Sequence, residues 1–461
     1  MDVLSPRRQP VSAPSSDGRT PTGWRTHLGR FAIALLAVAA VWSVGTRLAA
    51  RDDRAPGLAA GSTDVAQTIE ELEASARDRP DDPTVFQRLG NAYLDRSVRT
   101  LDPSYNDLAQ RAFDRAEVLA PGDLVTTLGR AGLAATRHDF AEALAAADAV
   151  LLDNPFSATA LAIQVDSEIE LGRYEDAETH LQAFLDRRPG AAALARVSYF
   201  HELHGDVDGA LVAIEDAEVA ASSGSIYDRA RLASVHGDVL LGAGELREAT
   251  ASYRRALRLV PELPTAVLGA ARADALLGDR VGAIRSLDAL VQRTPLPGAA
   301  MLLAELRAVE GDDEGAAHSR DLVTALATLE RAAGSNVDLD LAVFEADNTA
   351  VDPATVQRAT NTYANRPNIY AADALAWTLY RSGDAAAAAP MVEQALRTGT
   401  DDGQLRFHAA AVFAATGDLD RATAEMARSA QSNPWFSVAR QDEARALAVR
   451  LGVDWPTGPP S

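Results

Sequence analysis

The pattern His201-Glu202-Leu203-His204 is the part of the chain whose residue types come nearest to a metal site. Zinc-dependent hydrolysis uses two histidines four residues apart on one helix, with a glutamate between them as the base. Here the two histidines are three residues apart, and the turn Gly205-Asp206 follows at once. No third ligand is evident nearby. The pattern therefore favours an ordinary helix end, and we predict neither a metal site nor a catalytic residue.

The composition excludes several kinds of catalysis. All 44 basic residues are arginine, because the chain contains no lysine, and it contains no cysteine. Phosphate loops with a lysine, Schiff bases, thiol nucleophiles and thiolate metal sites are therefore excluded. The 65 acidic residues could still form a carboxylate pair in space, although nothing in the sequence selects one. The net charge of −21 argues against binding to nucleic acid, and no cofactor motif occurs.

Two acidic runs, at residues 311–315 and 401–403, contain the side chains that calcium prefers. Neither run has the alternating oxygen ligands of an EF-hand loop. Acidic residues in front of a helix instead satisfy its free amide groups and interact favourably with its dipole. We therefore expect turns and helix N-caps at both places.

The N-terminal region predicts a tail and a membrane segment. Residues 1–30 are rich in Pro, Ser, Thr and Arg and are expected to be disordered. Residues 31–50 begin with an uncharged apolar run slightly shorter than the roughly 20 residues that span a bilayer. A signal anchor, a cleaved signal and a buried helix all remain open. We expect the anchor, because Arg47 and Leu48 spoil the nearest cleavage sites.

The arginines around this segment predict its orientation. More arginines precede it than follow it, which places the N-terminus in the cytoplasm and the rest of the chain on the extracytoplasmic side. The expected localisation is the cytoplasmic membrane, with a single pass and a linker at residues 51–63.

A turn recurs through most of the remaining chain at spacings of 33, 34 or 39 residues, apart from one gap of 72. An alanine follows five residues after the start of each turn, and a proline then ends many of the units. Each unit is therefore predicted to form a helix, a turn and a second helix, which in many units ends at a proline. The predicted fold is all-α. Within the long gap, residues 348–352 take the place of a turn. The turns are His138-Asp139, Gly172-Arg173, Gly205-Asp206, Gly244-Glu245, Gly278-Asp279, Gly311-Asp312, Gly383-Asp384 and Gly417-Asp418.

These units resemble the tetratricopeptide-repeat (TPR) family over most of the chain. The best match is residues 86–121, and residues 230–263 match almost as well. The resemblance implies a right-handed superhelix of about ten repeats over residues 64–451, with a capping helix at each end and a disordered tail at 452–461. Two further stretches, residues 336–348 and 373–383, resemble the C-terminal part of bacterial proteins of this family. The matching residues are Phe86, Leu89, Gly90, Tyr93, Ala109, Phe113, Ala116 and Pro121, and then Gly237, Gly244, Ala249, Tyr253, Ala256 and Pro261.

A stripe of large side chains lies on the expected first helix of a late repeat. In this family the first helices line the concave surface, so the resemblance implies that the stripe faces the groove, where Tyr, Trp and Arg often anchor a partner. The alternative is that Trp377 and Tyr380 pack between repeats. Arg88 and Asn91 resemble two members of the family's peptide-carboxylate clamp, whose lysine this chain lacks. The stripe consists of Tyr370, Asp373, Trp377, Tyr380 and Arg381.

The expected function is a non-catalytic scaffold, tethered to the membrane through residues 31–50, that binds other proteins or peptides in its concave groove. One alternative is an envelope enzyme subunit, which predicts a buried acidic cluster with perturbed protonation. The other is a cytoplasmic adaptor, which requires residues 31–50 to form a helix that does not span the membrane.

Overall fold

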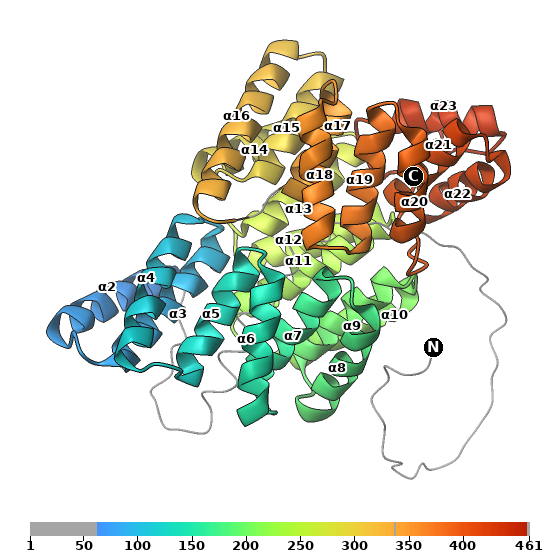
Figure 1. Ribbon diagram of the computed structural model, residues 1–461. Helices are drawn as coiled ribbons and strands as arrows, with labels where there is room; N and C mark the ends of the chain where they lie inside the picture. The colour runs from blue at the N-terminus through green and yellow to red at the C-terminus, as the bar shows by residue number, and fades with distance from the viewer. Residues whose placement is uncertain (1–61, 336–337, 459–461) are drawn as a thin grey trace, which may run out of the picture.

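The computed structural model describes residues 62–335 and 338–458 (Figure 1), and these residues form helices and no strand. The predicted tail at 1–30 and the predicted anchor at 31–50 lie outside the described residues. Among the helices that are described, none is both long and apolar enough to cross a bilayer. The expected single-pass localisation with an extracytoplasmic solenoid is corrected on this finding.

The helices follow one another as antiparallel pairs from α3 to α22, with α2 before the first pair and α23 after the last. Their bounds are α2 Ser62–Asp78, α3 Pro83–Thr100, α4 Ser104–Leu119, α5 Leu124–Thr136, α6 Phe140–Asp153, α7 Ala158–Glu170, α8 Tyr174–Arg187, α9 Ala191–Leu203, α10 Val207–Ala220, α11 Ile226–Gly242, α12 Leu246–Leu259, α13 Pro264–Leu276, α14 Arg280–Arg293, α15 Pro297–Val309, α16 Asp313–Ala332, α17 Asp338–Asn348, α18 Pro353–Asn365, α19 Ile369–Arg381, α20 Ala385–Ala395, α21 Gly403–Thr416, α22 Leu419–Ser432 and α23 Gln441–Leu451.

A glycine with positive φ forms the turn inside seven of the ten pairs, as the sequence predicts, and an aspartate N-cap follows the glycine in five of them. Gly278, for example, has a φ of 106°, in the left-handed region that favours glycine, and Asp279 then accepts a hydrogen bond from the amide of Gly282. The acidic runs follow the same rule, because Asp312 caps α16 and Asp402 caps α21. The prediction of turns and caps at these runs is confirmed.

Three pairs depart from the glycine turn, and in the first of them Leu101 follows α3 with a φ of 54°. His138 takes the place of the glycine with a φ of 63°, a conformation that costs a non-glycine residue free energy. Between α17 and α18 the connection has no glycine, and Asp352 caps α18 instead. The predicted replacement of a turn at residues 348–352 is therefore confirmed.

Neighbouring pairs are held together by aromatic rings that pack against glycines. Phe113 of α4 is fully buried and lies against Gly90 of α3 and Gly129 of α5, where an added Cβ would approach the ring to 2.6 and 2.3 Å. Tyr253 of α12 lies in the same way between two glycines, Gly237 and Gly269. Each ring therefore fills a space that only glycine leaves free, and each locks one pair onto the next.

The solenoid also closes on itself, because α7 and α8 meet the segment between α18 and α19. We call this contact the seam; it consists of Glu170, Tyr174, Arg366, Asn368 and Ile369. Arg366 forms an ion pair with Glu170, and both side chains are at most 4% exposed. Asn368 donates hydrogen bonds to the carboxylate and the carbonyl oxygen of Glu170, at 2.9 and 3.2 Å. The Ile369 amide donates to the Tyr174 hydroxyl at 3.0 Å.

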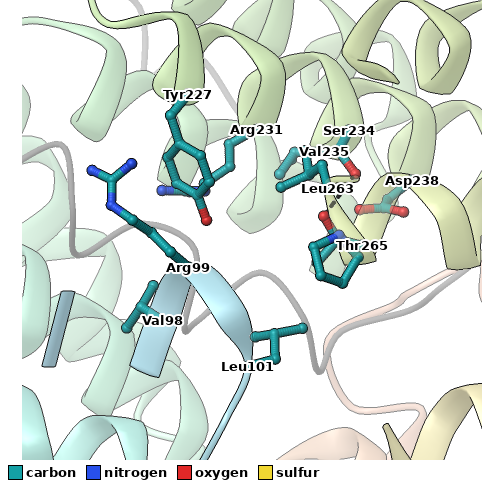
Figure 2. A pocket seen from close by; sticks show the side chains of 11 residues that line it. Val98, Arg99, Leu101, Tyr227, Arg231, Ser234, Val235, Asp238, Leu263 and Thr265 are labelled. Atoms are coloured by element: carbon teal, nitrogen blue, oxygen red, sulfur yellow. Dashed lines mark hydrogen bonds between the residues drawn. The ribbon is translucent and has the colours of Figure 1, made fainter. Parts of the chain in front are cut away.

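Further contacts bring both ends of the solenoid onto α11–α13, which lie in the middle of the molecule in Figure 1. Near the C-terminus, Asn433 donates to the carbonyl oxygen of Leu241 at 3.2 Å, and Trp435 packs into the core around α11–α13. Near the N-terminus, the guanidinium of Arg99 stacks on the ring of Tyr227 at 4.1 Å, as Figure 2 shows. The space beside this stack is about 20 Å³, enough for one water molecule.

Candidate binding cavity

A cavity of about 390 Å³, partly open to solvent, lies between the first helices of several pairs. Its wall combines apolar side chains such as Met301 and Phe344 with an excess of carboxyl groups. The arginine of the wall is Arg272 on α13. The acidic wall residues are Glu305 on α15, Glu330 on α16, Asp340 and Asp347 on α17, Asp373 on α19, and Asp402 at the start of α21.

Three charged side chains of the wall make no hydrogen bond or ion pair with the described residues. Within the described part of the chain, no hydrogen bond or ion pair involves the side chain of Arg272, Glu305 or Asp340. Arg272 is near enough to both carboxyls to favour their charged forms. One guanidinium nevertheless serves several carboxyl groups, so the wall keeps unpaired acceptors that a ligand with donors could use.

Burial makes these carboxyl groups hold their protons more tightly than usual. The pKa of Glu305 is raised to about 7, mainly by the removal of water; Arg272 opposes this rise and Asp347 contributes to it. Burial also raises the pKa of Asp340 to about 6. Asp340 is nevertheless accessible from the cavity space, so protein crowds its carboxyl group without sealing it off. The cavity therefore contains carboxyl groups that titrate near neutral pH.

The predicted stripe divides between the cavity and the core. Tyr370 and Asp373 lie on the cavity wall. Trp377 is completely buried; its Nε1 donates to Asp347 at 2.9 Å, and its ring stacks on His408 with centroids 3.9 Å apart. Tyr380 stacks on the ring of Trp377 and packs against the same core. The structure thus places Trp377 behind the wall, and the partner-binding role of the stripe stays a prediction.

The remaining predicted residues lie away from the cavity. Arg381 donates to the carbonyl oxygen of Ala346 and to Glu443, both at 3.1 Å. Arg88 is exposed on α3, and Asn91 donates to the carbonyl oxygen of Gln87 at 2.9 Å. Neither Arg88 nor Asn91 contributes to the wall. A role in partner binding stays a prediction for these three residues as well.

The two histidines of the opening motif serve separate structural contacts. His201 faces Asp206 at 2.9 Å, and His204 bonds through Nδ1 to the carbonyl oxygen of Phe200 at 2.9 Å. Within the described residues, no group of three or more His, Cys, Asp or Glu side chains could hold a metal ion. The helix end predicted here is confirmed, because α9 ends at Leu203.

Sequence reasoning missed Arg272, Glu305, Asp340 and Asp402. A weak signal exists for two of them, because Arg272 and Glu305 each lie six residues before the glycine of their turn, at the same place in successive first helices. Charged residues at a repeated position of mostly apolar helices could have marked a shared surface. Nothing in that pattern shows that the surface is closed into a cavity.

Comparisons with known proteins give a repeat family and several distant structures. A family model described as tetratricopeptide repeat matches residues 164–226, 235–296 and 374–434. Comparison with curated proteins gives no match. The similar solved structures include the human IFIT1 dimer with PPP-AAAA, at 14% identity over 72% of this chain and 78% of that chain, with a TM-score of 0.46.

Two further structures are equally distant. The APC/C hetero-tetramer Cut9-Hcn1 is 15% identical over 83% of this chain and 81% of that chain, with a TM-score of 0.41. Yeast Tom70 is 12% identical over 81% of this chain and 96% of that chain, with a TM-score of 0.32. The successive helix pairs and the three matched segments show that the chain contains tetratricopeptide repeats.

Proposed function

We propose that this protein is a non-catalytic scaffold that binds an extended segment of a partner protein in its central cavity. The observation that carries the proposal is the partly open cavity of about 390 Å³ between the first helices. Sites for small ligands occupy roughly 300–1,000 Å³, so the cavity suits a few side chains and excludes a folded domain. Repeat solenoids of this kind generally act by presenting such concave surfaces to partners.

Within this proposal the wall residues make the contacts and the residues behind them hold the wall in place. Tyr370 and Asp373 reach the segment directly. Trp377 fixes the position of their helix through its bond to Asp347 and its stack on His408. That nucleic acid is not a partner remains a prediction. The carboxyl groups of the wall support this prediction because their negative charge repels phosphate.

The test uses a substitution that fills the cavity. Gly298 lies on the wall, and a Cβ added there has its nearest neighbour, Cδ2 of Leu268, at 3.7 Å. Gly298→Trp should therefore fit and occupy part of the space. Random peptides displayed on phage are selected on the purified full chain, and the dissociation constants of the selected peptides are measured by titration calorimetry.

The matched control is Gly190→Trp, because an added Cβ at Gly190 has no atom within 4 Å and Gly190 is not part of the wall. We expect Gly298→Trp to weaken binding of selected peptides at least tenfold and Gly190→Trp to leave it unchanged. Failure to select any peptide, or equal binding by Gly298→Trp, would overturn the proposed function.

A carboxylate-dependent enzyme is the second candidate, and one observation favours it. The raised pKa values of Glu305, to about 7, and Asp340, to about 6, match the perturbed acidic cluster that this alternative predicts. The assay is hydrolysis of a panel of aryl glycosides and aryl esters by the wild-type chain and by Glu305→Gln. Turnover that disappears in Glu305→Gln would favour this candidate over the scaffold.

A further inference from the structure

The part of the wall formed by α19 and α21 combines an aromatic ring with two carboxyl groups. We call it the acidic corner; it consists of Tyr370, Asp373 and Asp402. We propose that the acidic corner binds a cationic side chain, an arginine or a lysine, of the segment that enters the cavity. The inference rests on the proposed function, because it names the chemistry of the ligand for the same cavity.

Asp402 is the first observation that points to a ligand. The residue is only 4% exposed, yet it lies on the cavity wall. Its Oδ1 accepts the amide hydrogen of Leu405, and within the described chain no hydrogen bond or ion pair involves its Oδ2. This oxygen faces the cavity without a donor from the protein, and a ligand ammonium or guanidinium would supply that donor.

The protein's own cations leave this corner open. Arg406 is the arginine next to Asp402, and it is turned toward Glu425, at 2.6 Å, and the carbonyl oxygen of Gly399, at 3.2 Å. Asp373 accepts from His408 at 3.0 Å, which fixes the position of its carboxyl group on the wall. The free guanidinium of Arg272 belongs to the surroundings of Glu305 and Asp340.

Tyr370 adds a contact that favours cations over other donors. Its side chain is partly buried and lies on the same wall as Asp402, whose charge is among those that act on it. An aromatic face attracts ammonium and guanidinium groups, and the attraction increases where water is removed. A neutral donor of the same shape would gain the hydrogen bond to Asp402 and would lose both the charge attraction and the contact with the ring.

Binding of a cation at this corner should release a proton. Burial raises the pKa of Asp402 well above its usual range, and the charges of Asp373 on α19 and Glu202 on α9 raise it further while Arg406 lowers it. Burial therefore favours the protonated form of Asp402 in the empty cavity. A ligand cation favours the ionised form, so the proton passes to the buffer on binding.

The test compares charge at one position of the ligand and at one position of the protein. Each arginine in a phage-selected peptide is replaced by citrulline and each lysine by acetyl-lysine, so that each replacement removes the charge. In the full chain, Asp402→Asn removes the charge and keeps a good helix N-cap. The control Asp418→Asn makes the same change at the exposed N-cap of α22.

We expect the neutral replacement of the peptide cation that enters the acidic corner to weaken binding about tenfold to a hundredfold. Asp402→Asn should weaken binding to the same extent, and Asp418→Asn should change it little. Calorimetry in two buffers of different ionisation enthalpy should show proton release that Asp402→Asn abolishes. Peptides that bind in the cavity but tolerate both neutral replacements everywhere would overturn this inference and leave the proposed function standing. A chain that selects no peptide overturns both.

Discussion

The contacts between neighbouring helix pairs and the contacts at the seam differ in their chemistry. Between neighbours, aromatic rings such as Phe113 pack against glycines in an apolar interior. At the seam, the central contact is the buried ion pair of Arg366 with Glu170, supported by Asn368. Apolar stacking stabilises through the removal of surface from water, whereas a buried ion pair gives back much of its attraction as desolvation. We therefore expect the neighbour contacts to contribute most of the stability and the seam to hold the two distant parts of the solenoid together.

The largest expected effect is on a neighbour contact. Phe113→Ala should lower the free energy of unfolding by about 4 kcal/mol, because it leaves a void between Gly90 and Gly129. Urea denaturation followed by circular dichroism measures it. The control Phe156→Ala removes a ring that is 56% exposed and should change little. Equal losses in the two variants would contradict the packing described for Phe113.

The seam should respond to loss of its cation. Arg366→Ala leaves Glu170 buried without its partner and should cost about 3 kcal/mol, whereas Arg366→Met combined with Glu170→Leu should recover most of that loss. Small-angle scattering should show a larger radius of gyration for Arg366→Ala at unchanged helix content.

The control for the seam is Arg421→Ala, because the ion pair of Arg421 with Glu393 is exposed and should contribute less than about 1 kcal/mol. An unchanged radius of gyration in Arg366→Ala would show that the apolar part of the seam holds these two parts together unaided.

The buried carboxyl group of Glu305 on the cavity wall predicts that the free energy of unfolding depends on pH. Because burial raises the pKa of Glu305 from 4.5 to about 7 in the folded chain, the folded state binds more protons than the unfolded state between these pH values. The free energy of unfolding should therefore fall as pH rises from 4.5 to 7, with a contribution from Glu305 on the order of 2 kcal/mol. The opposing and supporting charges are Arg272, Asp347 and Arg440.

Urea denaturation of wild type and Glu305→Gln across this pH range measures the contribution. We expect a flatter dependence for Glu305→Gln and an unchanged one for the exposed Glu314→Gln. A slope unaffected by Glu305→Gln would show that this carboxyl group is hydrated in the folded chain.

The smallest expected effect lies within a single pair. Asp279→Ala removes the N-cap of α14 and should cost about 1 kcal/mol, whereas Asp279→Asn should be nearly neutral because asparagine also caps helices well. The thermal midpoint measures both. A loss of the same size in Asp279→Asn would assign the effect to charge instead of capping.

The sequence by itself determined the repeated parts of the molecule. Glycine at Gly278 and Gly311, the caps at Asp312 and Asp402, and the break before Pro353 depend on backbone conformation within a few residues, so spacing alone predicted them. The family pattern also named Phe113, because each repeat needs the same ring to bury its neighbour.

Only the tertiary structure decided which side chains face the cavity. Residues of α19 from Ile369 to Thr378 are nearly all buried, because this helix packs against neighbours on several sides, so its periodicity could not separate Tyr370 from Trp377. The seam joins Glu170 to Arg366, 196 positions apart, and no local pattern encodes such a contact. The curvature that creates the cavity is a sum of small rotations between repeats, and it becomes visible only when the whole chain has folded.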